Sequence, residues 1–168
     1  MKVGFIGLGR MGKGMASRVL SGGHDLAVYD VAPQATAEFA QSGARVASSV
    51  ADVCKDREVV ITMLAEDFAV HEVAFGPGGI CASLPAGAIH MAMGTYGVAT
   101  IRALETAHAK ANQVLLAVPV LGRPDLARVP LPSGNAFRDR LLGAVAHGNG
   151  EKDWSVAAQE QARASGLE

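Results

Sequence analysis

The sequence predicts an α/β fold built on a parallel sheet. An apolar, β-prone run at residues 2–6 leads directly into the glycine motif Gly7-x-Gly9-x-x-Gly12. Further runs of this kind alternate with segments of helical spacing as far as residue 118, which is typical of strands joined by helical crossovers. The hydrophobic content of 49% is enough for a large core.

The first element is a strand, a glycine turn and a helix in direct succession. Gly7 allows a tight turn, Gly9 lets a pyrophosphate approach the backbone, and Gly12 lets the helix pack against its strand. The start of the helix offers free N–H groups and the positive end of a dipole to phosphates. Its apolar positions have helical spacing: Met11, Met15, Val19 and Leu20.

The second strand is expected over residues 24–30 and ends at Asp30. This carboxylate follows the glycine turn at about the 20-residue offset typical of the group that binds an adenosine ribose. A carboxylate there accepts hydrogen bonds from the ribose hydroxyls and repels a 2′-phosphate, which favours NAD, with NADP as the alternative. The competing interpretations are FAD or S-adenosylmethionine on the same fold, or an ordinary glycine turn.

The chain then continues the alternation of helices and strands. Pro33 suits the first turn of a helix that Gly43 ends, and Ser49 suits the N-cap of the next one. A run rich in β-branched residues at 58–64 predicts a central strand buried on both faces. The elements expected up to residue 84 are helices 33–42, 50–56, 68–75 and 80–84 and strands 44–47 and 58–64.

Two more strands, 87–92 and 113–118, flank a helix at 98–111. Six strands with right-handed crossovers favour the order 3-2-1-4-5-6, a doubly wound Rossmann fold. After Pro124 the pattern changes to two helices, 135–147 and 153–165. The sequence therefore predicts a dinucleotide-binding domain at 1–125 and a short all-α segment, an αα-hairpin, at 126–168.

The composition argues against several classes of binding partner. The net charge of −1 argues against nucleic acid or an anionic membrane surface as a partner. Residues 73–101 carry no Asp, Glu, Lys or Arg, but their glycines and prolines rule out one continuous membrane-spanning helix. Cys54 and Cys81 lack metal-ligand spacing and fit small buried side chains in a reducing, cytoplasmic compartment, with a disulfide between them as an unsupported alternative. No metal site is expected.

Several motifs together resemble those of the β-hydroxyacid dehydrogenase family, which includes 3-hydroxyisobutyrate dehydrogenases, semialdehyde and glyoxylate reductases and, more distantly, imine reductases. The resemblance covers roughly residues 1–125. It rests on Gly-Leu-Gly-x-Met-Gly at 7–12, Val-Tyr-Asp-Val at 28–31, Ser-Val-Ala-Asp-Val at 49–53, Ile-Thr-Met-Leu at 61–64, Gly-Gly-Ile at 78–80 and Pro-Val-x-Gly at 119–122.

The resemblance implies an NAD(P)-dependent oxidoreductase that transfers hydride between a nicotinamide and a small hydroxyacid, aldehyde or imine. It also implies a homodimer. The cofactor-binding positions carried over are Gly7, Leu8, Gly9, Arg10, Met11, Gly12, Asp30, Leu64, Ala65 and Thr95. The substrate positions carried over are Gly94, Gly122 and Arg123.

This chain departs from the family pattern in three places. Ala92-Met93-Gly94-Thr95 stands where the family usually has Asp-Ser-Ser-Thr, and Leu121 and Arg123 replace a Ser and a Gly. The family's catalytic Lys follows later, but this sequence has no Lys between Lys110 and Lys152. The last forty residues resemble the family's extreme C-terminus, so the chain looks like a family member with its middle removed. Because the catalytic Lys of the family is absent, the alternative function is a dinucleotide-binding module without turnover.

Four side chains have two interpretations each. His90 fits a hydrogen-bonded core histidine better than a base, and Lys152 fits a solvated lysine better than a catalytic one. Tyr96 could hydrogen-bond a substrate, but packing at a helix start is favoured. Arg123 is equally compatible with a surface arginine and with an anchor for a substrate carboxylate.

Overall fold

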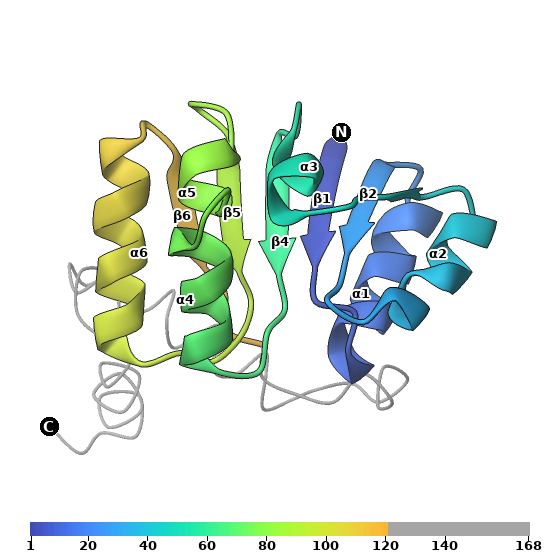
Figure 1. The fold of residues 1–168 in the computed structure, drawn as a ribbon, viewed down its shortest axis with the longest axis horizontal. Coiled ribbons are helices and arrows are strands. Elements are labelled where there is room, and N and C mark those ends of the chain that lie inside the picture. The colour runs from blue at the N-terminus through green and yellow to red at the C-terminus, as the bar shows by residue number, and fades with distance from the viewer. Residues whose placement is uncertain (121–168) are drawn as a thin grey trace, which may run out of the picture. The chain divides into compact units, whose positions relative to one another are not determined.

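The computed structural model describes residues 1–120 as a six-stranded, all-parallel sheet in the order β3-β2-β1-β4-β5-β6 (Figure 1). The predicted strand order is therefore confirmed. The strands are β1 (Lys2–Ile6), β2 (Asp25–Tyr29), β3 (Arg45–Val46), β4 (Val59–Thr62), β5 (Ile89–Ala92) and β6 (Val114–Ala117). All of them point the same way, so their C-terminal ends share one edge, the lower edge in Figure 1, which we call the carboxyl edge.

Helices cover both faces of this sheet. They are α1 (Arg10–Ser21), α2 (Ala37–Gln41), α3 (Val50–Cys54), α4 (Asp67–Phe75), α5 (Ile80–Ser83) and α6 (Val98–Lys110), with a 3₁₀ turn η1 (Pro33–Ala35) before α2. Parallel strands need such crossovers, and the crossovers leave the central strands with no solvent-facing side. The central strand β4 is accordingly buried at each of its residues.

The core has a separate cluster on each side of the sheet. On one side, α1 and α2 pack onto β1 and β2, where Phe5, Val28 and Phe39 are almost completely buried. On the other side, α3 and α5 pack onto β4, with Val53 and Ile80 at its centre. A third cluster between α4 and α6 includes Leu104 and half-buried Tyr96. These clusters fix the helices relative to the strand ends.

Most expected elements form, and most are shorter than expected. The strand predicted at 58–64 is Val59–Thr62, and the helix predicted at 50–56 ends at Cys54. The continuous helix predicted at 33–42 is wrong, because η1 and α2 occupy that stretch. Thr36 explains the break, since both its hydroxyl and its backbone N–H donate to the carbonyl of Pro33, which ends the first turn.

Several predictions fall outside the described residues: the helices expected at 135–147 and 153–165, the αα-hairpin at 126–168, and the residues Gly122, Arg123 and Lys152. Within residues 1–120, no helix is long and apolar enough to cross a membrane. Cys54 is buried, Cys81 is half-buried, and both are free thiols.

Candidate functional site

The glycine turn closes tightly against the sheet. Gly7 has a φ of +92°, a left-handed conformation that favours glycine. A Cβ on Gly12 would lie 1.8 Å from the Gly7 carbonyl oxygen, so α1 can approach the turn only with glycine there. A Cβ on Gly9 would meet nothing within 4 Å, which leaves open space above the turn. Each glycine thus has the environment that a phosphate-binding turn needs.

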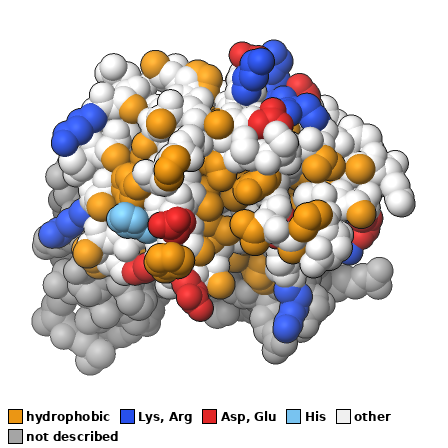
Figure 2. All heavy atoms as spheres, in the orientation of Figure 1, with side chains coloured by type: hydrophobic (Ala, Val, Ile, Leu, Met, Phe, Trp, Pro, Cys, Tyr) orange, Lys and Arg blue, Asp and Glu red, His pale blue; other side chains and the backbone are white. Residues whose placement is uncertain are grey.

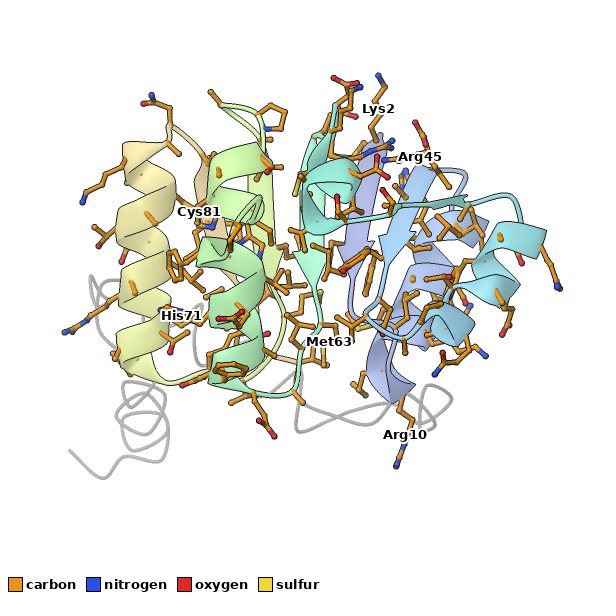
Figure 3. The ribbon with its side chains drawn as sticks, in the orientation of Figure 1. Lys2, Arg10, Arg45, Met63, His71 and Cys81 are labelled. Atoms are coloured by element: carbon orange, nitrogen blue, oxygen red, sulfur yellow. The ribbon has the colours of Figure 1, made fainter. Side chains whose placement is uncertain are left out.

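The N-terminus of α1 has no capping side chain and no acidic residue in its first turn. Its first helical hydrogen bond runs from the Lys13 N–H to the Gly9 carbonyl, so the preceding N–H groups stay available. Arg10 extends outward from this end of the helix at the carboxyl edge (Figure 3). Leu8 is buried in the core, so its backbone rather than its side chain faces the site.

Asp30 joins the end of β2 to the glycine turn. Its Oδ2 accepts a hydrogen bond from the Leu8 N–H at 2.6 Å, and its Oδ1 accepts one from the Ala32 N–H at 2.8 Å. These two bonds hold the carboxylate in place, and the residue as a whole is half-buried. The predicted proximity of Asp30 and the glycine turn is therefore present in the structure.

Two loops at the carboxyl ends of β4 and β5 are hydrogen-bonded together. The Tyr96 hydroxyl donates to the Leu64 carbonyl at 3.2 Å. The Gly97 N–H donates to both carboxylate oxygens of Asp67, at 3.0 and 3.2 Å. These bonds join the loop after β4 to the loop that starts α6.

The other predicted residues of this region lie on the same two loops. Ala65 and Thr95 are exposed, Leu64 is half-buried and Gly94 is buried. The structure thus brings the β4 and β5 loops to the same edge as the glycine turn. The exposed face of α4 next to them carries Asp67, Phe68, His71 and Glu72, where acidic, hydrophobic and histidine side chains meet on the surface (Figure 2).

Behind this edge lies a buried chain of polar side chains that the sequence analysis missed. Thr62 Oγ1 is 3.0 Å from His90 Nε2, His90 Nδ1 is 2.8 Å from His108 Nε2, and His108 Nδ1 is 2.7 Å from Gln113 Oε1. The Gln113 amide donates to the carbonyls of Cys81 and Leu84. His90 is therefore a hydrogen-bonded core histidine, as expected.

The hydrogen-bond partners fix both histidine tautomers. Because the Gln113 Nε2 group donates to two carbonyls, its Oε1 is the acceptor, and His108 donates through Nδ1. Neutral His108 then accepts at Nε2 from His90 Nδ1, and neutral His90 accepts at Nε2 from the Thr62 hydroxyl. Every donated proton in this series of hydrogen bonds points from Thr62 towards Gln113.

Burial keeps these histidines neutral. Desolvation lowers the pKa of His90 to about 3, and repulsion from the positive charge that His108 would carry when protonated adds to this shift. Desolvation also lowers the pKa of His108, although its bond to Gln113 opposes that shift. Neither ring is a suitable acid or base at neutral pH, so the pair has a structural role.

No lysine of residues 1–120 lies on the β4 and β5 loops. Lys2 begins β1 at the opposite edge (Figure 3), Lys55 precedes β4, and Lys110 ends α6 next to the start of β6. Lys13 lies on α1 and forms an ion pair with Glu38. The same residues contain no group of histidine, cysteine or acidic side chains placed to hold a metal ion.

A hollow of about 330 Å³ lies between α1 and α2, away from these loops. It is lined by Ser17, Leu20, Ser21, Glu38, Phe39 and Ser42. None of the residues predicted to bind cofactor or substrate contributes to it, so the candidate site remains the carboxyl edge.

Comparison with known proteins gives the same assignment. Residues 2–129 match the family model described as the NAD binding domain of 6-phosphogluconate dehydrogenase. An uncharacterized oxidoreductase of Bacillus subtilis is 42% identical over 127 residues, which cover 76% of this chain and 44% of that protein. Human mitochondrial 3-hydroxyisobutyrate dehydrogenase is 37% identical over 158 residues, which cover 94% of this chain and 44% of that protein.

Solved structures agree with the sequence matches. The crystal structure of 3-hydroxyisobutyrate dehydrogenase from Salmonella typhimurium superimposes with a TM-score of 0.69 at 28% identity, over 74% of this chain and 44% of that one. The chain thus spans less than half the length of these relatives. The chain belongs to the family of the NAD-binding domain of 6-phosphogluconate dehydrogenase, and its relatives there are 3-hydroxyisobutyrate dehydrogenase-like oxidoreductases.

Proposed function

We propose that this chain binds a nicotinamide dinucleotide along the carboxyl edge of its sheet. The pyrophosphate would lie on the glycine turn and the uncapped N-terminus of α1, and the adenosine ribose on Asp30. The observation that carries this proposal is the hydrogen bond between Asp30 and the Leu8 N–H. It brings a carboxylate suited to ribose hydroxyls next to the amides that suit phosphate.

NAD is the preferred dinucleotide in this proposal. A 2′-phosphate would bring negative charge against the Asp30 carboxylate. Residues 31–44 contain no Lys or Arg that could compensate for it. Arg45, the next basic residue, donates to the Asp52 carboxylate at 2.7 Å and is engaged there.

The proposed reaction is hydride transfer with a small hydroxyacid, aldehyde or imine. A bound nicotinamide dinucleotide would supply or accept the hydride. Leu64, Ala65 and Thr95 would line its nicotinamide side, because their loops end at the same edge as the glycine turn. Gly94, with Gly122 and Arg123 outside the described residues, would contact substrate.

The second candidate function is dinucleotide binding without turnover. It is favoured by the positions of the lysines within residues 1–120, none of which lies on the β4 or β5 loop. The two candidates differ in one measurement, NADH-dependent reduction of small carbonyl compounds. A homodimer remains a prediction, which sedimentation velocity of the purified chain would test.

Calorimetric titration of the purified chain with NADH, NADPH, FAD and S-adenosylmethionine tests the proposal. NADH should bind about tenfold or more tighter than NADPH, the range expected for hydrogen bonds to a charged group. FAD and S-adenosylmethionine should not compete with NADH for this site. A chain that bound neither nicotinamide dinucleotide would contradict the proposed function, and equal affinities for the two would contradict the role given to Asp30.

A further inference from the structure

Tyr96 occupies a defined place at the carboxyl edge. Its hydroxyl donates to the Leu64 carbonyl, and its ring packs against the cluster between α4 and α6. The residue as a whole is half-buried, and its hydroxyl is the anchored part. It lies on the same loop as Thr95 and Gly94, which are expected to contact the cofactor and the substrate.

The absence of a side chain at Gly94 leaves space for this phenol. A Cβ on Gly94 would lie 2.3 Å from both the Cζ and the hydroxyl oxygen of Tyr96. No larger residue fits at that position while Tyr96 keeps its place. The glycine that departs from the family pattern is therefore structurally coupled to the tyrosine two residues later.

Two neighbouring side chains influence the phenol. Asp67, the first residue of α4, accepts a hydrogen bond from the Gly97 N–H, and its charge raises the pKa of Tyr96. Thr62 has the opposite effect and lowers the pKa of Tyr96.

The phenol is also the most acidic O–H group on these loops. Thr62 and Thr95 carry aliphatic hydroxyls, and residues 62–68 and 92–98 contain no Lys, His, Cys or Arg. The acids among them, Glu66 and Asp67, are exposed carboxyls. Tyr96 is thus the half-buried group here that stays protonated at neutral pH and can give up that proton.

We propose that Tyr96 faces the reacting end of the dinucleotide and donates a proton to the substrate during reduction. This inference rests on the proposed function and adds the residue that completes its chemistry.

The proposed step balances as follows for a carbonyl substrate. A bound reduced nicotinamide would supply hydride, with its electron pair, to the carbonyl carbon. The π electrons of the C=O bond would move to oxygen. The Tyr96 hydroxyl would turn from the Leu64 carbonyl to that oxygen, and its O–H bond would break as the oxygen takes the proton. The phenolate then recovers a proton from water. An imine would follow the same course, with nitrogen in place of oxygen.

The electrostatics keep the phenol protonated. Burial raises the pKa of Tyr96 and the Asp67 charge adds to the rise, although contacts with Leu64, Thr62 and Gly94 oppose it. The phenol is therefore protonated at neutral pH, the state required of a donor.

Carbon-13 NMR of the chain labelled at tyrosine Cζ tests whether Tyr96 faces the nicotinamide. The sequence has two tyrosines, Tyr29 and Tyr96, and the variants Tyr29→Phe and Tyr96→Phe assign the two resonances. Tyr29 precedes Asp30, so ADP-ribose, NAD and NADH should all shift its signal. The Tyr96 signal should move with NAD and NADH, by different amounts, and stay in place with ADP-ribose.

The NMR outcomes separate the two proposals. If no dinucleotide shifts either tyrosine signal, the proposed function fails. If Tyr29 responds to all three ligands while Tyr96 responds to none of them, or to ADP-ribose as strongly as to NADH, cofactor binding stands and the inference fails.

Turnover tests the proton donation. NADH-dependent reduction of glyoxylate and of a cyclic imine would be compared in the unaltered chain, Tyr96→Phe and the control Tyr29→Phe. Tyr96→Phe should lower kcat about a hundredfold or more, the typical contribution of a general acid, with NADH affinity preserved. Unchanged kcat in Tyr96→Phe, or an unaltered chain that binds NADH but reduces neither compound, would overturn Tyr96 as the donor.

Discussion

Asp30 and Leu8 are 22 residues apart in the sequence, and the Asp30 carboxylate accepts a hydrogen bond from the Leu8 N–H at 2.6 Å. This bond links the end of β2 to the middle of the glycine turn. The part of the site that would hold the ribose and the part that would hold the pyrophosphate are thereby positioned together. A change at Asp30 should consequently affect both affinity and discrimination.

The first prediction concerns cofactor preference. Asp30→Asn removes the negative charge but keeps an oxygen for the Leu8 N–H. We expect NADH affinity to fall about tenfold, since a charged acceptor is lost, while NADPH affinity falls less or rises. Calorimetry with both dinucleotides measures the ratio. Asp56→Asn, at an exposed position beside the start of β4, is the matched control and should leave both affinities unchanged.

The second prediction concerns the approach of α1 to the turn. Gly12→Ala would place a methyl group against the Gly7 carbonyl, so we expect the free energy of unfolding to drop by about 2 kcal/mol or more. Gly14→Ala, an exposed position of the same helix, should instead raise it by up to about 1 kcal/mol, because alanine favours helix. Urea denaturation of both variants provides the comparison. A Gly12→Ala chain of undiminished stability would contradict the tight contact.

The third prediction is a pH dependence of stability. The folded chain holds His90 with a pKa of about 3, whereas an unfolded histidine titrates near its ordinary value of 6.5. The unfolded state therefore binds more protons between these values, and stability is full above pH 6.5 and falls below it. For His90 alone the loss at about pH 5 is about 2 kcal/mol.

Urea denaturation at about pH 7.5 and about pH 5 measures this loss. His90→Gln should make the difference between the two conditions smaller. His71→Gln, which alters an exposed histidine of α4, should leave the difference as it is. An unaltered chain with equal stability at both pH values would show that the buried pair is not held neutral.

The sequence was sufficient to predict the strand order and the glycine turn. Both depend on local patterns: apolar runs of strand length, glycine spacing and right-handed crossovers. Element ends were predicted less well, since Thr36 breaks an otherwise helical pattern through hydrogen bonds that a hydrophobicity pattern does not contain. In the site, the closeness of Asp30 to the glycine turn could be predicted from the usual sequence offset between these two features.

Contacts between distant side chains could not be predicted in this way. His90 and His108 lie 18 residues apart and meet only because α6 packs back against the sheet at β6, the neighbour of β5. The position of Tyr96 over Gly94 likewise depends on the path of one loop. A glycine two residues before a tyrosine is no signal by itself, but Gly94 stands where the family usually has a serine, so the sequence already marked this loop as a departure from the family pattern.

The buried polar chain from Thr62 to Gln113 is also a row of aligned dipoles. Each O–H and N–H points away from the carboxyl edge, so the individual dipoles add, and the apolar surroundings screen them weakly. The negative end of the row is the Thr62 oxygen, where β4 ends. An electric field built into the core therefore favours positive charge at the edge where we place the nicotinamide, whose oxidised ring is the cationic one.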